Sequence, residues 1–140
     1  MKFRIRDTDI QFDFGFFAAL CIMALIMPYL LFLYGLIGAF IHELGHITAI
    51  CCCGDGVKKM HFLIGGIKII RQRKRLLSYK QDLIIMFAGA FANIIAAVLL
   101  LCAGNRQAGC INLCLAFFNL LPLPHLDGGD IVCTIKEMLQ

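Results

Sequence analysis

A nearly uninterrupted apolar run over residues 14–53 constrains this chain more than any other feature of its sequence. Glu43 is the only formally charged side chain in the run. A membrane-spanning helix needs ~20 apolar residues, so the run is about twice too long for one crossing and fits two helices joined by a turn at Pro28. With 61% hydrophobic and 16% charged residues, the chain has too little polar surface for a water-soluble domain. The sequence therefore predicts an integral membrane protein.

Two more apolar segments follow at residues 83–103 and 109–121. We therefore expect an all-α membrane protein with about four transmembrane helices, folded as a single domain over residues 1–140. Residues 54–82 are rich in lysine and arginine, which by the positive-inside rule places them in the cytoplasm. An even number of spans on either side then places both termini in the cytoplasm. The basic residues are Lys58, Lys59, Lys68, Arg71, Arg73, Lys74, Arg75 and Lys80.

An imperfect alternation of polar and apolar residues over residues 57–69, around Gly65-Gly66, predicts a small cytoplasmic β-hairpin directly after the second helix. In the favoured interpretation the hairpin is solvated, and its charges set the membrane orientation and contact anionic head groups. In the other, its edge strand binds an extended substrate by strand addition. Membrane orientation explains the net charge of +4, so we expect no nucleic-acid partner.

The sequence His42-Glu43-Leu44-Gly45-His46 places two imidazoles four residues apart inside the apolar run. On a helix such residues share one face, ~6 Å apart along the axis, where both can bind one zinc ion. Glu43 lies ~100° around the helix, beside the metal without being a ligand, which is the general-base position of an HExxH metalloprotease. The alternative is a chance match with histidines that make core hydrogen bonds. An ionisable group at bilayer depth favours a functional site.

A third ligand is expected near the C-terminus, because catalytic zinc usually takes three protein ligands. Residues 118–130 end an apolar helix with two prolines, then give an acidic residue and paired glycines. Such non-helical backbone is tolerated at membrane depth only where protein or a water-filled cavity surrounds it. Asp127 is the natural oxygen ligand. His125 is a rival nitrogen ligand, and Asp130 is a weaker rival that can instead begin a terminal helix over residues 130–139.

Two amides in the apolar segments, Asn93 and Asn119, are candidates for substrate binding. An amide in a membrane helix can instead hydrogen-bond a neighbouring helix, an interaction worth ~0.6 kcal/mol on average. For Asn93, helix pairing is the favoured interpretation and substrate binding the alternative. For Asn119 the order is reversed, because it lies one or two turns before the break that carries Asp127.

Three motifs in this order resemble the site-2 protease family of intramembrane zinc metalloproteases, peptidase family M50. Residues 42–46 match its HExxH helix, residues 78–93 resemble the start of its third helix, and residues 119–129 match its motif NxxPxxxLDGG. The resemblance covers residues 14–129 and is greatest to the short sporulation-type branch. The chain departs from the family at Ala90, where proline is usual.

The resemblance implies an intramembrane metalloprotease domain that binds Zn²⁺ through His42, His46 and Asp127. Glu43 would be the catalytic base, and Asn119 would hold the substrate backbone or the developing oxyanion. The implied reaction is hydrolysis of a peptide bond in or near a transmembrane segment of a membrane-tethered substrate, such as a regulator precursor.

The implied setting is a multi-pass protein of a bacterial cell membrane. The expected partners are a membrane-embedded protein substrate and the lipid bilayer, with a regulatory membrane protein or a second copy of the chain as further candidates. The alternative function is a catalytically silent membrane scaffold of the same fold that binds membrane segments.

Overall fold

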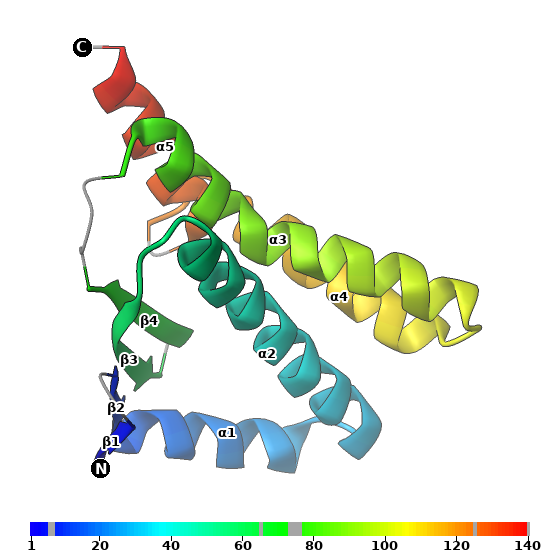
Figure 1. Ribbon diagram of the computed structural model, residues 1–140. Helices are drawn as coiled ribbons and strands as arrows, with labels where there is room; N and C mark the ends of the chain where they lie inside the picture. The colour runs from blue at the N-terminus through cyan, green and yellow to red at the C-terminus, as the bar shows by residue number, and fades with distance from the viewer. Residues whose placement is uncertain (6–7, 65, 73–76, 125, 140) are drawn as a thin grey trace.

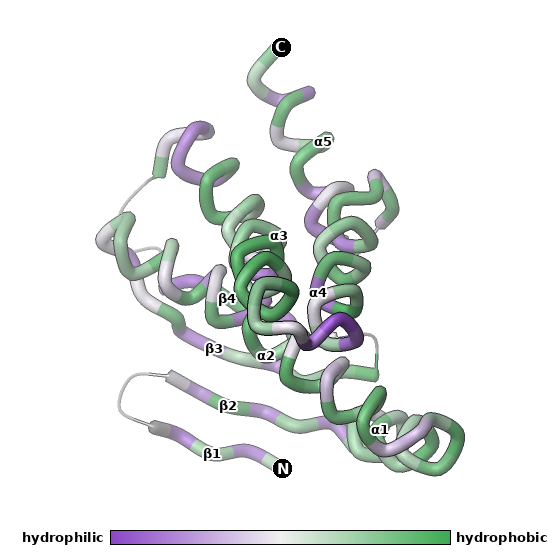
Figure 2. Tube along the Cα trace, turned by 90° about the vertical axis from the view of Figure 1, so that its right-hand side faces the viewer, coloured by the Kyte–Doolittle hydropathy of each residue, from purple (hydrophilic) through white to green (hydrophobic). Residues whose placement is uncertain are grey.

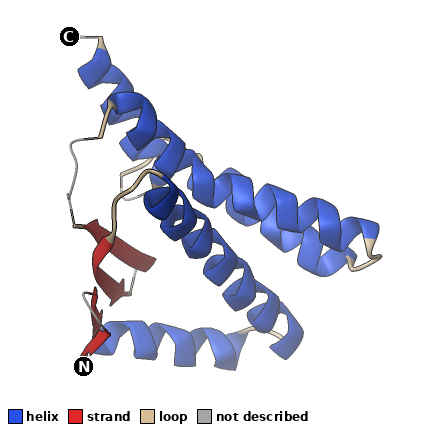
Figure 3. Cartoon of the chain, viewed as in Figure 1, coloured by secondary structure: helices blue, strands red, loops and turns tan. Residues whose placement is uncertain are grey.

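The structure is a computed structural model that describes residues 1–5, 8–64, 66–72, 77–124 and 126–139. Helices make up most of the molecule, and the strands lie together at one side of it (Figure 3). The elements in chain order are β1 (Lys2–Ile5), β2 (Thr8–Phe12), α1 (Phe14–Ile26), α2 (Tyr29–Cys52), β3 (Val57–Leu63), β4 (Gly66–Arg71), α3 (Tyr79–Cys102), α4 (Arg106–Asn119) and α5 (Asp127–Met138) (Figure 1).

The four strands form one mixed sheet in the order β1-β2-β3-β4. Both β1–β2 and β3–β4 pair antiparallel, whereas β2 and β3 pair in parallel with Asp9 opposite Lys59. The Thr8 hydroxyl adds a hydrogen bond to the carbonyl of Val57 at 2.8 Å. Because β2 precedes α1 and β3 follows α2, this pairing brings the chain back from α2 to the place where α1 begins.

The sheet contradicts the expectation of an all-α fold. The expected hairpin is present as β3 and β4, but β1 and β2 enlarge it to a sheet of four strands. These residues alternate polar and apolar side chains, as in Lys2-Phe3-Arg4 and Asp9-Ile10, which suits a half-exposed strand. Of the basic residues assigned to the hairpin segment, Arg73, Lys74 and Arg75 lie outside the described residues.

The expectation of four transmembrane helices is also wrong. Among the described residues, only α2 and α3 are long and apolar enough to cross a membrane, and each has 24 residues. Helix α1 has 13 residues and α4 has 14, so each is ~20 Å long, less than the ~30 Å hydrocarbon core of a bilayer. The turn at Pro28 is where it was expected, but strand β2 and Asp13 take up the residues before α1, and α4 ends at Asn119 before the prolines.

The helices bury small residues and expose large ones. Ala90 and Ala97 of α3 are 1% exposed, whereas Phe91 is 62% exposed and Leu99 65% exposed. Figure 2 shows apolar residues along α1 to α4, with hydrophilic residues concentrated in the sheet and near helix ends. Small residues between helices and large apolar residues outside are typical of membrane helices, whose packing does not depend on water exclusion.

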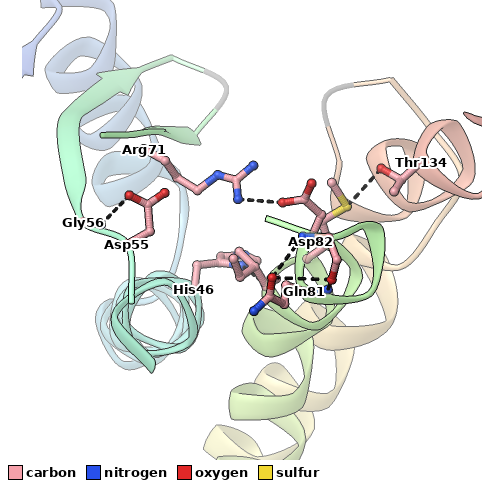
Figure 4. A network of polar contacts seen from close by, with 10 residues as sticks. His46, Asp55, Gly56, Arg71, Gln81, Asp82 and Thr134 are labelled. Carbon is pink, nitrogen blue, oxygen red and sulfur yellow. Dashed lines mark hydrogen bonds and ion pairs between the residues drawn. The ribbon is translucent and has the colours of Figure 1, made fainter. Parts of the chain in front are cut away.

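Polar contacts join the sheet to the start of α3 (Figure 4). Ser78 caps the helix by accepting a hydrogen bond from the backbone of Gln81, whose side chain accepts one from the Ser78 backbone. Arg71, the last residue of β4, donates to Asp82 at 2.6 Å. The expected start of a helix near residue 78 is confirmed, and the C-terminal end of β4 is held against it through Arg71.

Candidate metal centre

His42 and His46 lie on the face of α2 that packs against α3. The His42 residue is 6% exposed, and the His46 side chain is 12% exposed. Their ring centroids are 4.7 Å apart, and their Nε2 atoms are separated by 3.1 Å. The four-residue spacing thus brings both imidazoles to one point between the helices.

Asp127 reaches the same point from the other end of the chain. It is the first residue of α5, and its Oδ2 lies 3.0 Å from Nε2 of His42 and 3.2 Å from Nε2 of His46. The ligand atoms of the three residues lie within 4.8 Å of one another, and no other such group of three is found within the described ranges. Asp130, one turn further along α5, is exposed, and His125 lies outside the described residues.

Gly128 allows α5 to begin close to the end of α4. A β-carbon at this residue would overlap the backbone carbonyls of Leu120 and Leu121. Gly129 is similarly close to the carbonyl of Leu123. The paired glycines therefore let the first turn of α5 pack against the backbone that follows α4, which places Asp127 beside the histidines.

The hydrogen bonds of His46 determine which of its ring nitrogens can bind a metal. Its Nδ1 lies 2.8 Å from the carbonyl oxygen of Ile85 on α3, and a carbonyl can only accept. In the neutral imidazole, Nδ1 therefore carries the proton and Nε2 carries a lone pair directed at Asp127. Lone pairs that converge at this distance repel unless a cation or a proton lies between them. Two imidazole nitrogens and one carboxylate oxygen are a donor set that suits catalytic Zn²⁺.

Gly89 of α3 completes the enclosure of the two imidazoles. A β-carbon at residue 89 would overlap Nε2 of His46 and would lie 2.7 Å from Nε2 of His42. Gly45 of α2 plays a similar part, since its β-carbon would lie 2.5 Å from the carbonyl of Ala88. Sequence reasoning did not select Gly89 as a site residue, and its only signal was its position in the segment that resembles the family's third helix.

The remaining candidate residues lie around this group. Glu43 follows His42 on α2 and is half-buried. Asn119 ends α4, and its Nδ2 donates to the carbonyl of Leu115 at 2.9 Å. Asn93 is fully buried in α3. Of the expected site residues, the structure brings together the three expected metal ligands, with Glu43 adjacent in sequence.

The fold and the site together define the class of protein: its apolar helices enclose a His-His-Asp group, formed by His42, His46 and Asp127, that could hold a metal ion. A family model described as Peptidase family M50 matches residues 106–140. The fold is similar to that of the site-2 protease from Methanocaldococcus jannaschii, with a TM-score of 0.79, 23% sequence identity, and coverage of 99% of this chain and 72% of that chain. A comparison with curated proteins found no match. The match over residues 106–140 supports the resemblance to peptidase family M50, and the fold is that of the archaeal site-2 protease.

Proposed function

We propose that this protein is an intramembrane zinc metalloendopeptidase formed by a single domain. The observation that carries the proposal is the convergence of His42, His46 and Asp127 within 4.8 Å, on and beside the two helices long enough to span a membrane. The match to the M50 family model and the shared fold with the archaeal site-2 protease support the same class.

Zn²⁺ would be held by Nε2 of each histidine and by the carboxylate of Asp127. When bound, it supplies Lewis acidity, which makes water a nucleophile near neutral pH and polarises a peptide carbonyl. The negative charge of Asp127 offsets part of the charge of the cation in surroundings of low dielectric constant, where an uncompensated charge is costly. The Ile85 carbonyl holds the ring of His46 in the tautomer that this arrangement requires.

Glu43 and Asn119 would act on the water and the substrate. Glu43 accepts a proton from the attacking water and returns it to the leaving amine. Asn119 holds the substrate backbone or the developing oxyanion. One of its amide protons bonds the Leu115 carbonyl, so the second proton is the one that can point toward the substrate.

The proposed substrate is a membrane-tethered protein with a locally unwound segment, because a continuous helix keeps its carbonyls in internal hydrogen bonds. Strand β4 is at the end of the sheet and its residues alternate between exposed and half-buried. These observations support the interpretation in which an extended substrate adds to this edge. A regulator precursor as substrate, and likeness to the sporulation-type branch, remain predictions.

We further propose that the protein is embedded in the membrane with the sheet on the cytoplasmic side. Lys58 and Lys59 of β3 and Lys68 of β4 lie in the sheet, and the pairing of β2 with β3 places the N-terminus with them. The bilayer is then a partner of the exposed apolar helices. A regulatory membrane protein or a second copy of the chain is a further candidate partner.

Zinc analysis and cleavage of a membrane-segment peptide by the purified protein in detergent test the proposal together. We expect about one zinc per chain, since the donor set forms one site, and cleavage that stops when a chelator removes the metal and returns when zinc is restored. Full cleavage by the metal-free protein would refute the assignment. Zinc binding without cleavage of any membrane segment would favour the silent scaffold instead.

A further inference from the structure

Two buried asparagines near the metal ligands have polar atoms without hydrogen-bond partners. Asn93 is 0% exposed, and neither atom of its amide has a partner among the described residues. Asn112 of α4 is 1% exposed; its Nδ2 donates to the carbonyl of Ala108 at 2.9 Å, but its Oδ1 has no partner within the same described ranges. Buried polar atoms are normally paired with protein or with internal water, so this cluster requires an explanation.

Asn93 faces the place where α2, α3 and α4 meet. It lies one turn from Gly89 and one turn from Ala97 on the same face of α3. Gly89 packs against the imidazole of His42 on α2, and the carbonyl of Ala97 lies 3.2 Å from the position of a β-carbon on Gly109 of α4. Asn93 is therefore between the part of α3 that contacts α2 and the part that contacts α4.

Asn112 faces the same junction from α4. It follows Gly109 by three residues, so both share the face of α4 that packs on α3. Its Oδ1 lies 3.3 Å from the position of a β-carbon on Gly38 of α2, and Gly38 is one turn before His42. Helices α3 and α4 run antiparallel, and Ala97 of α3 is level with Gly109 of α4. One turn nearer the metal centre, Asn93 of α3 is therefore level with Asn112 of α4.

The Nδ1 atom of His42, one turn after Gly38 on α2, is also buried and has no partner among the described residues. When Nε2 of His42 binds a metal, Nδ1 must carry the proton and becomes a hydrogen-bond donor. Metal-binding histidines almost always donate this proton to an oxygen. His46 does so to the Ile85 carbonyl at 2.8 Å. Among the described residues of α2, α3 and α4, the Oδ1 atoms of Asn93 and Asn112 are the buried side-chain acceptors that lack a partner.

We propose that Asn93 and Asn112 bind an internal water molecule that accepts the Nδ1 proton of His42 and donates to the Oδ1 atom of each asparagine. Three polar partners are typical of a buried water. Both asparagines are then positioning residues that hold the orientation and tautomer of His42. This inference rests on the proposed zinc site, and it gives Asn93 a role inside the helix packing in place of substrate contact.

Zinc affinity, measured by competition with a chromophoric chelator, tests the proposal. Asn93→Leu and Asn112→Leu remove the acceptors and keep the branched shape of the side chain, and we expect each to bind zinc ~10- to 100-fold more weakly. Asn93→Ser keeps an oxygen at the site and should restore most of the affinity. Thr134→Val is the control, because Thr134 is also buried and its hydroxyl bonds the sulfur of Met86, away from His42; its zinc affinity should equal that of the wild type.

Two further measurements separate positioning from a general structural role. The metal-free Asn93→Leu variant should unfold at the same temperature as the wild type or higher, because an apolar side chain replaces an amide that has no partner among the described residues. With ¹⁵N-labelled histidine, the zinc-bound wild type should show two slowly exchanging Nδ1–H signals. In Asn93→Leu, the signal from His42 should exchange with solvent while the one from His46 persists.

The proposal is overturned if the wild type binds zinc and both leucine variants bind it equally tightly with both signals unchanged. A wild type that binds no zinc would instead refute the proposed function, so the two failures are distinguishable. Should Asn93→Leu not fold, Asn112→Leu decides the question by the same measurements.

Discussion

Gly89 of α3 lies so close to the imidazole of His46 that no β-carbon fits between them. The face of α2 that carries His42 and His46 is thus shaped by a residue that has no side chain. A side chain at residue 89 would lie between the backbones of α2 and α3, in the space that the two imidazoles occupy. It must therefore displace one or both histidine rings.

Gly89→Ala should therefore lose most of its zinc while remaining folded, since the methyl group occupies the space of the imidazole nitrogens. Gly35→Ala is the matched control, because a β-carbon on that glycine of α2 meets nothing within 4 Å. The control should keep its zinc and gain up to about 1 kcal/mol of stability from helix propensity. Metal analysis and thermal unfolding give both results; normal zinc content in Gly89→Ala would contradict the packing described for α3.

Asp127→Ala should lower zinc occupancy and abolish cleavage, because two imidazoles alone leave the donor set incomplete. Asp130→Ala removes the same charge from the same helix at an exposed position and should keep both properties. Metal content of the two variants, purified side by side, tests the ligand assignment. The reverse order would remove Asp127 from the ligand set.

Glu43→Gln should retain zinc and lose cleavage by ~10²- to 10⁴-fold, because an amide cannot accept the proton of the attacking water. The rate of peptide cleavage and the zinc content are measured on the same preparation. Loss of the metal together with activity would mean that Glu43 supports the site in another way than as a base.

Lysine labelling in sealed vesicles tests the orientation. A membrane-impermeant amine reagent should modify Lys2 and Lys59 from the same face, since β2 and β3 pair in one sheet. A lysine introduced by Asn105→Lys, in the connection between α3 and α4, should react only from the opposite face. Modification of all three from one face would exclude a membrane-spanning α3.

Asp13 predicts a pH-dependent contribution to stability at the junction of the sheet and α1. His61 of β3 donates to its carboxylate at 2.9 Å, and this hydrogen bond holds the pKa of Asp13 below its ordinary value of 3.8. A lowered pKa stabilises the folded state above pH 3.8, and the effect disappears as the pH falls through the folded-state pKa. Asp13→Asn should therefore be less stable than the wild type at pH 6, and the difference should vanish in acid. A difference that persists in acid would point to packing instead.

Sequence reasoning selected His42, His46 and Asp127, which the structure brings together, because their signals are local. The spacing of His42 and His46 puts both on one helical face, and two prolines that follow an apolar helix before Asp127 prevent that helix from continuing. It failed for the sheet because β2 finds its partner 50 residues later, at Lys59 opposite Asp9. The number of spans was predicted from the lengths of the apolar segments alone. Strand β2 takes up residues directly before α1, so this helix is shorter than the apolar run suggests.

The contributions of Gly89 and Asn112 were missed for a related reason. A glycine or an amide in an apolar helix has many uses, and only the identity of the neighbouring helix selects among them. That identity depends on how α2, α3 and α4 pack, which no single segment of the sequence specifies.

The parallel pairing of β2 with β3 also dictates an order of events during synthesis. Strand β2 leaves the ribosome before α1 and α2, yet its partner becomes available only after both helices have been made. A two-stranded β1–β2 hairpin is at best marginally stable in water, so one edge of β2 stays unpaired until β3 has been synthesised. The sheet can therefore close only after the helix that carries His42 and His46 has been made, and the β2–β3 pairing then fixes both ends of the α1–α2 pair at one sheet.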